Sequence, residues 1–152
     1  MQQKYKLLIG ERSAEEVKIS IGQAIPSKEI KEAALRGRNL ITGLPEQVMV
    51  SSEDVRRALE KSLGQIVEAV RATIEDTPPE LLADIMSNGI FLSGGGSMLR
   101  GFDALLAAET KMKVNIVEDP LTAVARGGGI VLEQLEAMKS ILLATDSSAS
   151  PH

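Results

Sequence analysis

The chain has 152 residues, 43% of them hydrophobic and 25% charged, which is the composition of a single folded globular domain rather than of a disordered segment. It has no cysteine and one histidine, the terminal His152, which excludes a disulfide scaffold, a thiol nucleophile and a cysteine metal site and makes a Ser-His-Asp triad implausible. Few aromatic residues and a net charge of -4 argue against nucleic-acid binding, and without a membrane-length apolar run or signal-peptide pattern the protein is expected to be soluble and intracellular.

The first predicted elements mix helix and strand signals. Residues 3–10 are typical of a helix end followed by a glycine stop. Ser13 and Glu16 have the spacing of a capping box, which predicts a helix with Ser13 as N-cap that ends at Gly22. The alternating apolar residues of 17–21 would also suit a strand, but the capping box favours the helix.

Strands and then a long helix are predicted after Pro26. Residues 28–36 and 39–50 have the mixed polarity of two short antiparallel strands. Ser51 and Asp54 then open a helix whose apolar residues recur at spacings of three and four. This stripe consists of Val55, Leu59, Leu63, Ile66, Val70 and Ile74.

A helix joint, a second helix and a strand follow. Gly64 interrupts the apolar stripe and predicts a joint between two helices. Thr77 is expected to be the N-cap of the next helix, with Glu80 at its third position, and Gly89 is expected to end it. Residues 90–92 (IFL) predict a short buried strand.

Three glycines stand directly after that strand, and a helix to about Glu109 is predicted after them. Without Cβ atoms, Gly94, Gly95 and Gly96 let the backbone approach a flat ligand and adopt positive φ, and a helix N-terminus offers free N–H groups. The arrangement suits a nucleotide site, although a tight turn that binds nothing is equally compatible with it. The spacing matches neither a Walker A loop nor a dinucleotide fingerprint.

The last predicted elements are a strand over 114–117 and a long helix, capped by Asp119-Pro120 and running to about Lys139. Gly127-Gly128-Gly129 lies inside this helix, where three glycines cost about 3 kcal/mol relative to alanine. Either another backbone packs closely against them or a helix begins there. Residues 141–152, rich in Ser and Ala, are expected to be a loose tail.

Taken together, five segments resemble the MreB family of bacterial actin homologues. They are residues 7–18 (LLIGERSAEEVK), 36–45 (RGRNLITGLP), 77–81 (TPPEL), 93–101 (SGGGSMLRG) and 119–127 (DPLTAVARG). The resemblance extends from about Tyr5 to Lys139, nearly the whole chain. A long ordered series of segments is far more specific than a single glycine loop.

The resemblance implies an α/β fold of the actin-like ATPase (ribonuclease H-like) type, of which this chain is the C-terminal half. Residues 1–62 would be the small α+β subdomain, entered part-way, residues 63–139 the later half of the large subdomain, and residues 140–152 a flexible tail. The N-terminal half would be missing, with both phosphate-binding hairpins, the magnesium-linked aspartate, the water-orienting residue and the membrane-inserting segment. Met1 is therefore not expected to be the family's natural start.

The resemblance also implies a nucleotide site, of which this chain holds the adenosine side. The expected contacts with adenine and ribose are Gly94, Gly95, Gly96 and Met98, and those from the small subdomain are Glu15 and Lys18. Residues 125–129 would be the second connector between the lobes. ATP is the implied cofactor, and Mg²⁺ belongs to the intact family protein at a site outside this chain. No catalytic residue is expected here, and this chain alone is expected to hydrolyse ATP negligibly.

The function implied by the resemblance is that of a filament subunit. In the family, ATP-bound subunits polymerise into membrane-associated filaments that direct cell shape and side-wall peptidoglycan synthesis at the cytoplasmic face of the membrane. Expected partners are further copies, the missing N-terminal half and the cell-wall elongation machinery, with no nucleic acid and no direct membrane segment in this chain. The alternatives are a non-catalytic interaction module and one half of a split actin-fold protein.

Overall fold

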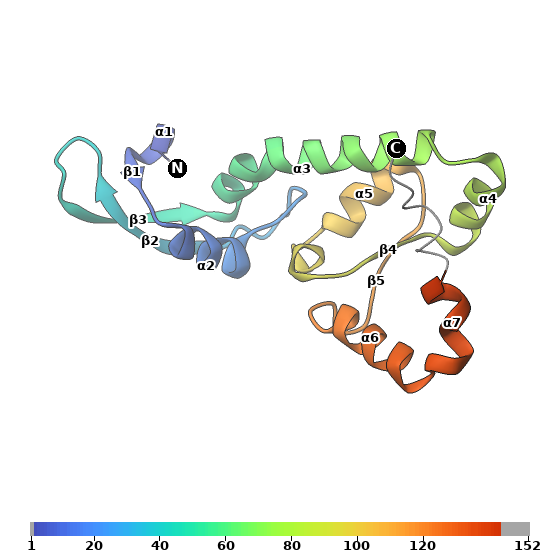
Figure 1. Ribbon diagram of the computed structural model, residues 1–152. Helices are drawn as coiled ribbons and strands as arrows, with labels where there is room; N and C mark the ends of the chain where they lie inside the picture. Colours follow the sequence, from blue (N-terminus) through green and yellow to red (C-terminus); the bar gives the residue numbers. More distant parts are fainter. Residues whose placement is uncertain (1, 144–152) are drawn as a thin grey trace, which may run out of the picture.

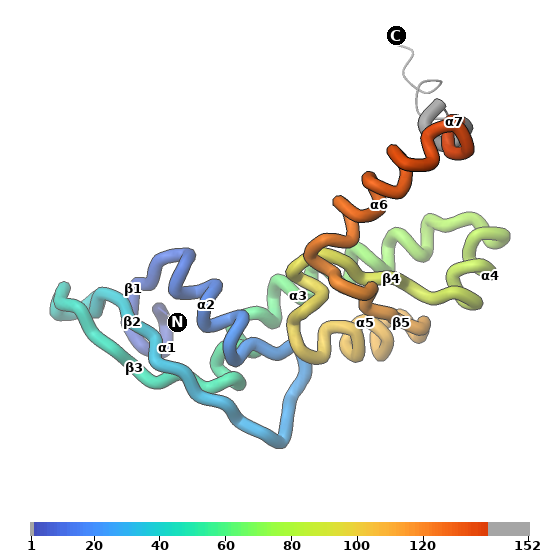
Figure 2. The backbone as a smooth tube through the Cα atoms, turned by 90° about the horizontal axis from the view of Figure 1, so that it is seen from below, coloured from blue at the N-terminus to red at the C-terminus, as the bar shows by residue number. Residues whose placement is uncertain are grey.

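The computed structural model describes residues 2–143, which form two lobes joined by one long helix (Figure 1). The first lobe contains α1 (Gln2–Tyr5), β1 (Leu7–Leu8), α2 (Glu11–Ile21), β2 (Glu32–Asn39) and β3 (Pro45–Ser51), and α3 (Ser52–Glu75) leads to the second lobe. The second lobe contains α4 (Pro79–Asn88), β4 (Ile90–Leu92), the 3₁₀ helix η1 (Gly95–Met98), α5 (Phe102–Thr110) and β5 (Val114–Ile116). The helices α6 (Ala123–Glu133) and α7 (Leu135–Leu143) extend away from this lobe (Figure 2).

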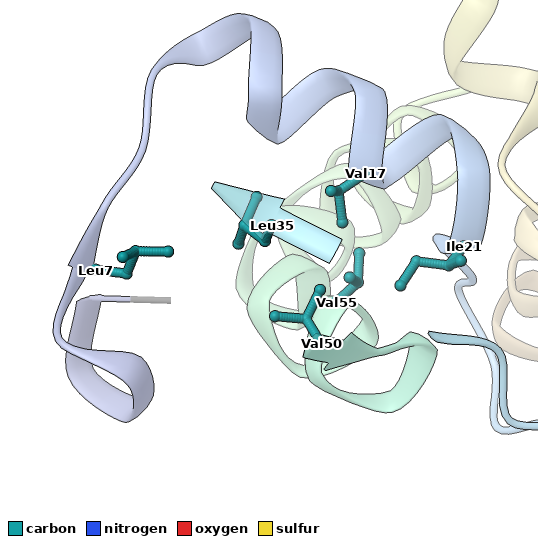
Figure 3. Packing of buried hydrophobic residues seen from close by; sticks show 6 residues of the cluster. All are labelled: Leu7, Val17, Ile21, Leu35, Val50 and Val55. Atoms are coloured by element: carbon teal, nitrogen blue, oxygen red, sulfur yellow. The ribbon is translucent and has the colours of Figure 1, made fainter. Parts of the chain in front are cut away.

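An antiparallel sheet in the order β1-β2-β3 forms the body of the first lobe. Alternation along the strands turns Leu35 of β2 and Val50 of β3 toward one face, which α2 covers with Val17 and Ile21 (Figure 3). The two predicted strands are confirmed as an antiparallel pair, with boundaries several residues later than expected. The core is aliphatic throughout, because the lobe has no buried aromatic side chain among its core residues.

The start of α2 differs from its prediction. The helix begins at Glu11 with Gly10 as N-cap, and no side chain caps it, so the predicted capping box at Ser13 is wrong. The carbonyl oxygen of Gly10 already accepts a hydrogen bond from the N–H of Ala14 at 3.1 Å, which closes the first helical turn before Ser13. The helix itself and its end at Gly22 are confirmed.

The segment before α2 also differs from its prediction. The predicted helix end over residues 3–10 holds only for α1, because the chain turns at Lys6 with φ of 51° and Leu7 and Leu8 form β1. Leu7 is completely buried and pairs with Asn39 of β2. Burial of this side chain in the sheet therefore overrides continuation of the helix.

The helix α3 is continuous and begins at the predicted capping box. The hydroxyl oxygen of Ser51 accepts from the N–H of Asp54 at 3.2 Å, and the Asp54 carboxylate accepts from the N–H of Ser51 at 3.2 Å. The predicted joint at Gly64 is wrong, because one helix runs through this position. Glycine lacks a side chain but keeps its backbone hydrogen-bonding groups, and Gly64 borders open space. The helix runs through residues 62 and 63, where the boundary between the two subdomains was predicted. The division of the chain into these subdomains stays a prediction.

The second lobe has its own small core beneath two parallel strands. β4 pairs with β5, α5 packs against β5, and α3 packs against α5. The buried core residues are Ala24, Leu63, Val67, Phe102 and Leu106. The predicted strand over 90–92 is confirmed, but its expected burial is wrong: Phe91 is 62% exposed, because residues 2–143 cover only one face of this two-stranded sheet.

The helix α4 begins one residue later than predicted. Pro78, not Thr77, is its N-cap. The hydroxyl of Thr77 donates to the carbonyl oxygen of Thr73 at 2.6 Å, so this side chain completes the end of α3 and is unavailable to cap α4. Gly89 ends α4 as predicted, with φ of +85°.

The final helical stretch is two helices where one was predicted. α6 begins at Ala123, not at Asp119-Pro120, because Asp119 lies in a turn with φ of 47° whose carbonyl oxygen accepts from the N–H of Thr122 at 3.2 Å. The helix direction breaks at Gln134, and α7 continues to Leu143, into the segment predicted to be a tail. The rest of that predicted tail, residues 144–152, lies outside the described residues.

Candidate nucleotide site

The glycine loop after β4 is held from two sides. Gly94 has φ of +80°, a conformation that a side chain would strain, and its N–H donates to the carbonyl oxygen of Pro120 at 2.8 Å. Ser97 is 3% exposed and its hydroxyl donates to the carbonyl oxygen of Gly94 at 2.7 Å. The predicted helix directly after the loop is instead η1, and α5 begins only at Phe102.

The loop borders open space. A Cβ atom built on Gly94 or Gly96 would meet no described atom within 4 Å, and one on Gly95 would meet only the Leu121 Cδ2 atom at 3.5 Å. Met98 beside them is 56% exposed. A bare backbone next to an apolar side chain is a surface that a flat aromatic base fits, and Cβ atoms would fill the space that the base needs.

The end of the loop is fastened to the end of α2. Arg100 Nε donates to the carbonyl oxygen of Gly22 at 3.1 Å, and the N–H of Ala24 donates to the carbonyl oxygen of Arg100 at 2.8 Å. This contact needs a glycine at position 22. A Cβ atom there would lie only 2.2 Å from a backbone oxygen of α2 and 3.1 Å from Leu99 Cδ1. The first lobe therefore contacts the loop directly, through residues 78 positions apart in sequence.

Glu15 and Lys18 lie on the exposed surface of α2, three positions apart and therefore on neighbouring parts of one face. Both line a pocket of about 340 Å³ between α2 and α3. Its other lining residues are Ile9, Glu11, Ala14, Val17, Leu35, Val55, Ala58 and Leu59. No residue of the glycine loop lines this pocket, so within residues 2–143 the two predicted groups of contacts occupy adjoining surfaces rather than one cavity.

Sequence reasoning named the glycines and Met98 but missed the two side chains that hold the loop. The Ser97 hydroxyl bonds to the backbone of the loop at Gly94, and Arg100 bonds to the backbone at the end of α2. Ser97 could have been found, because a serine that follows a glycine turn often bonds back to the backbone. Arg100 could not, because its partner is a carbonyl group far away in the sequence.

The most perturbed ionisable groups lie outside the site, at the start of α3. Burial would raise the pKa of Asp54, but hydrogen bonds from Lys4, Tyr5 and Ser51 outweigh it and hold the pKa well below the usual range. Hydrogen bonds from Arg56 lower the pKa of the neighbouring Glu53 to about 2. The bonds to Asp54 join α1 and β3 to the start of α3, whereas the Glu53–Arg56 pair lies within α3.

Three further features bear on the sequence predictions. Residues 2–143 contain no group of three or more metal-ligating side chains that could hold a metal ion, and in the same part of the chain no helix is long and apolar enough to cross a membrane. Cβ atoms built on Gly127, Gly128 and Gly129 would meet nothing within 4 Å. The backbone expected to pack closely against these glycines is therefore not found among the described residues.

Comparison with known proteins relates nearly the whole chain to one family. The family profile described as MreB/Mbl protein matches residues 1–140. The cell shape-determining protein Mbl of Bacillus cereus is 46% identical over 138 residues, 91% of this chain and 41% of that protein. The cell shape-determining protein MreB of Escherichia coli is 46% identical over 136 residues, 90% of this chain and 39% of that protein.

Solved structures show the same relationship in three dimensions. MreB5 of Spiroplasma citri bound to ADP superimposes with a TM-score of 0.84 at 33% identity, over 88% of this chain and 41% of that one. The complex of the same protein with AMPPNP also superimposes with a TM-score of 0.84, at 32% identity over 94% of this chain and 42% of that one. A MamK double helical filament superimposes with a TM-score of 0.63 at 25% identity, over 78% of this chain and 36% of the MamK chain.

These likenesses confirm the predicted actin-like α/β fold. The chain spans about two fifths of the length of the curated relatives that it matches, and its expected place in their C-terminal half stays a prediction. Those relatives are cell shape-determining proteins. The profile match over residues 1–140 and the identities of 46% show that this chain belongs to the MreB/Mbl family.

Proposed function

We propose that this chain supplies the adenosine side of an ATP cleft in an actin-like, filament-forming protein that determines cell shape. The observation that carries the proposal is the open glycine loop at residues 94–96, fastened through Arg100 to α2. Structural neighbours bound to ADP and to AMPPNP support it.

Each site residue has a role that suits its chemistry. The backbone of Gly94, Gly95 and Gly96 gives the base close access, and the exposed Met98 gives it an apolar surface. From α2, Glu15 offers hydrogen-bond acceptors and Lys18 offers donors to the polar atoms of adenosine. ATP would supply the phosphoanhydride for phosphoryl transfer, and the residues of this chain would bind and orient its base and ribose.

Hydrolysis by this chain alone is expected to be negligible. Phosphoryl transfer depends on a bound metal, a phosphate cradle and a positioned water. We assign none of these to residues 2–143, where no group of three or more metal-ligating side chains could hold a metal ion, and on the family resemblance the Mg²⁺ site would lie outside this chain. The chain therefore contributes to binding and assembly rather than to chemistry.

Assembly with further copies is part of the proposal, and the name of the MamK double helical filament supports it. The same function places the protein at the cytoplasmic face of the membrane, with the remaining part of the family fold and the cell-wall elongation machinery as partners. The names of Mbl and MreB as cell shape-determining proteins support this assignment.

Isothermal titration of the chain with ATP tests the nucleotide proposal. Weak binding is expected, equal with Mg²⁺ and with EDTA, because the contacts with adenosine need no metal. Gly95→Val should abolish it. The Cβ atom of the new side chain would meet only Leu121 within 4 Å among the described residues, in ordinary van der Waals contact, and the valine would fill the space for the base.

Gly64→Ala, at an exposed glycine of α3, is the matched control and should bind ATP like the unchanged chain. Tight, magnesium-dependent binding, or binding that Gly95→Val leaves unchanged, would show that the nucleotide lies elsewhere.

A second candidate function is a non-catalytic interaction module, including half of a split actin-fold protein. The apolar surface of α6 favours it, since Val124 is 81% and Leu132 73% exposed. A chain of this kind would show no thermal stabilisation by ATP, whereas the nucleotide site predicts a rise in melting temperature with ATP concentration.

A further inference from the structure

One edge of β2 is paired over only part of its length. On this side β1 pairs with Asn39 and Arg38 through Leu7 and Leu8 and then leaves the sheet. β2 continues back to Glu32, and β3 accompanies it along the whole of its other edge. The part of β2 that β1 does not reach is therefore an open strand edge inside the first lobe.

The backbone groups at this open edge belong to Ala34 and Arg36. The N–H of Asn39 donates to the Leu44 carbonyl oxygen toward β3 at 2.9 Å, and backbone groups alternate in direction along an antiparallel strand. Odd-numbered residues of β2 therefore bond to β3, and Ala34 and Arg36 face away from it. β1 pairs with β2 only at Asn39 and Arg38, and no turn, loop or cap bond among residues 2–143 involves the N–H groups or the carbonyl oxygens of Ala34 and Arg36.

A groove of about 380 Å³ lies along the same edge. Four consecutive residues of β2 line one wall, Ala33, Ala34, Leu35 and Arg36, and the other wall is α2 with Ser13, Glu16, Val17 and Ser20. Consecutive strand residues point to opposite faces, so a groove that touches all four lies at the strand edge. β3 occupies the other edge, which places the groove on the open one, with room for about four extended residues.

The side chains around the groove define what fits it. Leu35 and Val17 are buried and give it an apolar floor. The Ser20 hydroxyl donates to the carbonyl oxygen of Val17 and keeps its oxygen free to accept. Arg36 bonds to a neighbouring glutamine only through Nε, which leaves the end of its guanidinium exposed. Glu16, the one acidic group in the groove wall, is paired with Arg12 at 3.0 Å.

The N-terminal part of the chain, to which the groove belongs, carries a net positive charge. Residues 1–40 hold eight Lys or Arg against five Asp or Glu, whereas the rest of the chain holds nine against sixteen. Arg36 and Arg38 lie two positions apart on the exposed face of β2. A partner with acidic side chains on this face would be attracted, and a basic one repelled.

We propose that the groove between α2 and the open edge of β2 binds a short extended segment of a partner protein, in which apolar and acidic residues alternate. The segment adds to the sheet as a strand beside β2, through the backbone groups of Ala34 and Arg36. Its apolar side chains pack on Leu35 and Val17, and its acidic side chains lie beside the two arginines. The groove contains none of the predicted nucleotide contacts, but it shares Val17 and Leu35 with the pocket beside Glu15 and Lys18.

Amide hydrogen exchange, followed by NMR on the whole chain, tests the proposal. The probe is an acetylated and amidated hexapeptide of alternating valine and aspartate. At saturating peptide, exchange at Ala34 and Arg36 should slow at least tenfold, because their N–H groups become bonded. Exchange at Leu35 and Gly37 should not change, because these amides already face β3.

Two controls isolate the backbone pairing. The same hexapeptide with N-methylated amides keeps its side chains and loses its donors, and it should give no protection. Ala34→Pro removes the N–H of the open edge without removing any bond to β3, and it should abolish binding, whereas Ala34→Val keeps the N–H and should bind normally. The N-methylated peptide decides the matter if the proline variant does not fold.

Unchanged exchange at Ala34 and Arg36, or equal protection by the N-methylated peptide, overturns the proposal. Protection at these two amides that rises with protein concentration in the absence of peptide also overturns it, because a second copy of the chain would then occupy the edge.

Discussion

At the scale of single residues, Asp54 connects three elements of the first lobe. It caps α3 with Ser51, accepts the hydroxyl of Tyr5 at 2.6 Å and pairs with Lys4. Its side chain is only 10% exposed, so an unpaired carboxylate here would be costly. A single half-buried carboxylate therefore joins α1 to the start of the helix that links both lobes.

Asp54→Ala should lower the free energy of unfolding by about 2 kcal/mol, the size expected for a lost cap and charged hydrogen bonds. The pKa of Asp54 is lower in the folded chain than in the unfolded one. Its contribution is therefore complete above the unfolded value, about 3.9, and is lost as pH falls toward the folded value. Urea unfolding from pH 7 to pH 3 measures both effects.

The matched control is Asp84→Ala, which removes an exposed carboxylate on α4. This variant should have nearly the same free energy of unfolding as the unchanged chain at pH 7. As the pH falls, it should lose as much stability as the unchanged chain does. An Asp54→Ala variant whose stability falls with pH as steeply as that of the unchanged chain would contradict the assignment.

The candidate site was predictable where its chemistry is local and not where it depends on distant contacts. A strand followed by Gly94, Gly95 and Gly96 is visible in the sequence, and the open space around those glycines agrees with it. The bond from Arg100 to Gly22 is not visible, because it joins two lobes. For Glu15 and Lys18 the sequence offered only the family resemblance, and their contact with adenosine stays a prediction.

At the scale of elements, periodicity predicted the helix and strand types well, and local bonds decided the boundaries. The apolar stripe and the capping box at Ser51 gave α3 correctly. The starts of α2 and α4 were wrong because Gly10 closes the first turn of α2 and because the hydroxyl of Thr77 bonds back to α3. A cap motif predicts that a helix is present, but it does not fix the first residue of that helix, because the hydroxyl can bond to other backbone groups instead.

The continuity of α3 leads to a prediction at Gly64. This residue is exposed inside an unbroken helix, and a Cβ atom there would meet open space. Gly64→Ala should therefore raise the free energy of unfolding by about 1 kcal/mol, the difference in helix propensity. Thermal unfolding measures the change.

Gly43→Ala is the comparison, because Gly43 also borders open space but has φ of +74° in the turn between β2 and β3. The same substitution should there lower the free energy of unfolding by about 1 kcal/mol. A loss of stability in Gly64→Ala would mean that the helix bends at this position after all.

At the scale of the whole molecule, two small cores are joined by α3, and much apolar surface remains uncovered within residues 2–143. Phe91 and Ile116 on the two-stranded sheet are 62% and 44% exposed, and Val124 and Leu132 on α6 are 81% and 73% exposed. Among the residues that the structure describes, β4 and β5 pair only with each other, so each keeps an open edge. Sequence patterns could not show this exposure, because they identify apolar residues but not what covers them.

We expect the chain to self-associate at micromolar concentration, because open edges and apolar faces of this size attract further strands and apolar surfaces. Sedimentation equilibrium should show a mass that rises with concentration. Phe91→Lys, which places a charge on the exposed face of β4, should reduce the association. A stable monomer over a wide concentration range, with cooperative unfolding, would show that the described residues complete their own sheet.

The central claim is that the adenosine side of a nucleotide cleft lies between the glycine loop and α2. Mapping of amide chemical shifts during titration with adenosine, and separately with tripolyphosphate, tests it most directly. The account predicts that adenosine shifts the signals of Gly94, Gly95, Gly96 and Lys18 together and that tripolyphosphate shifts none of them. Shifts caused by tripolyphosphate at these residues, or no shift by adenosine at the glycine loop, would contradict it.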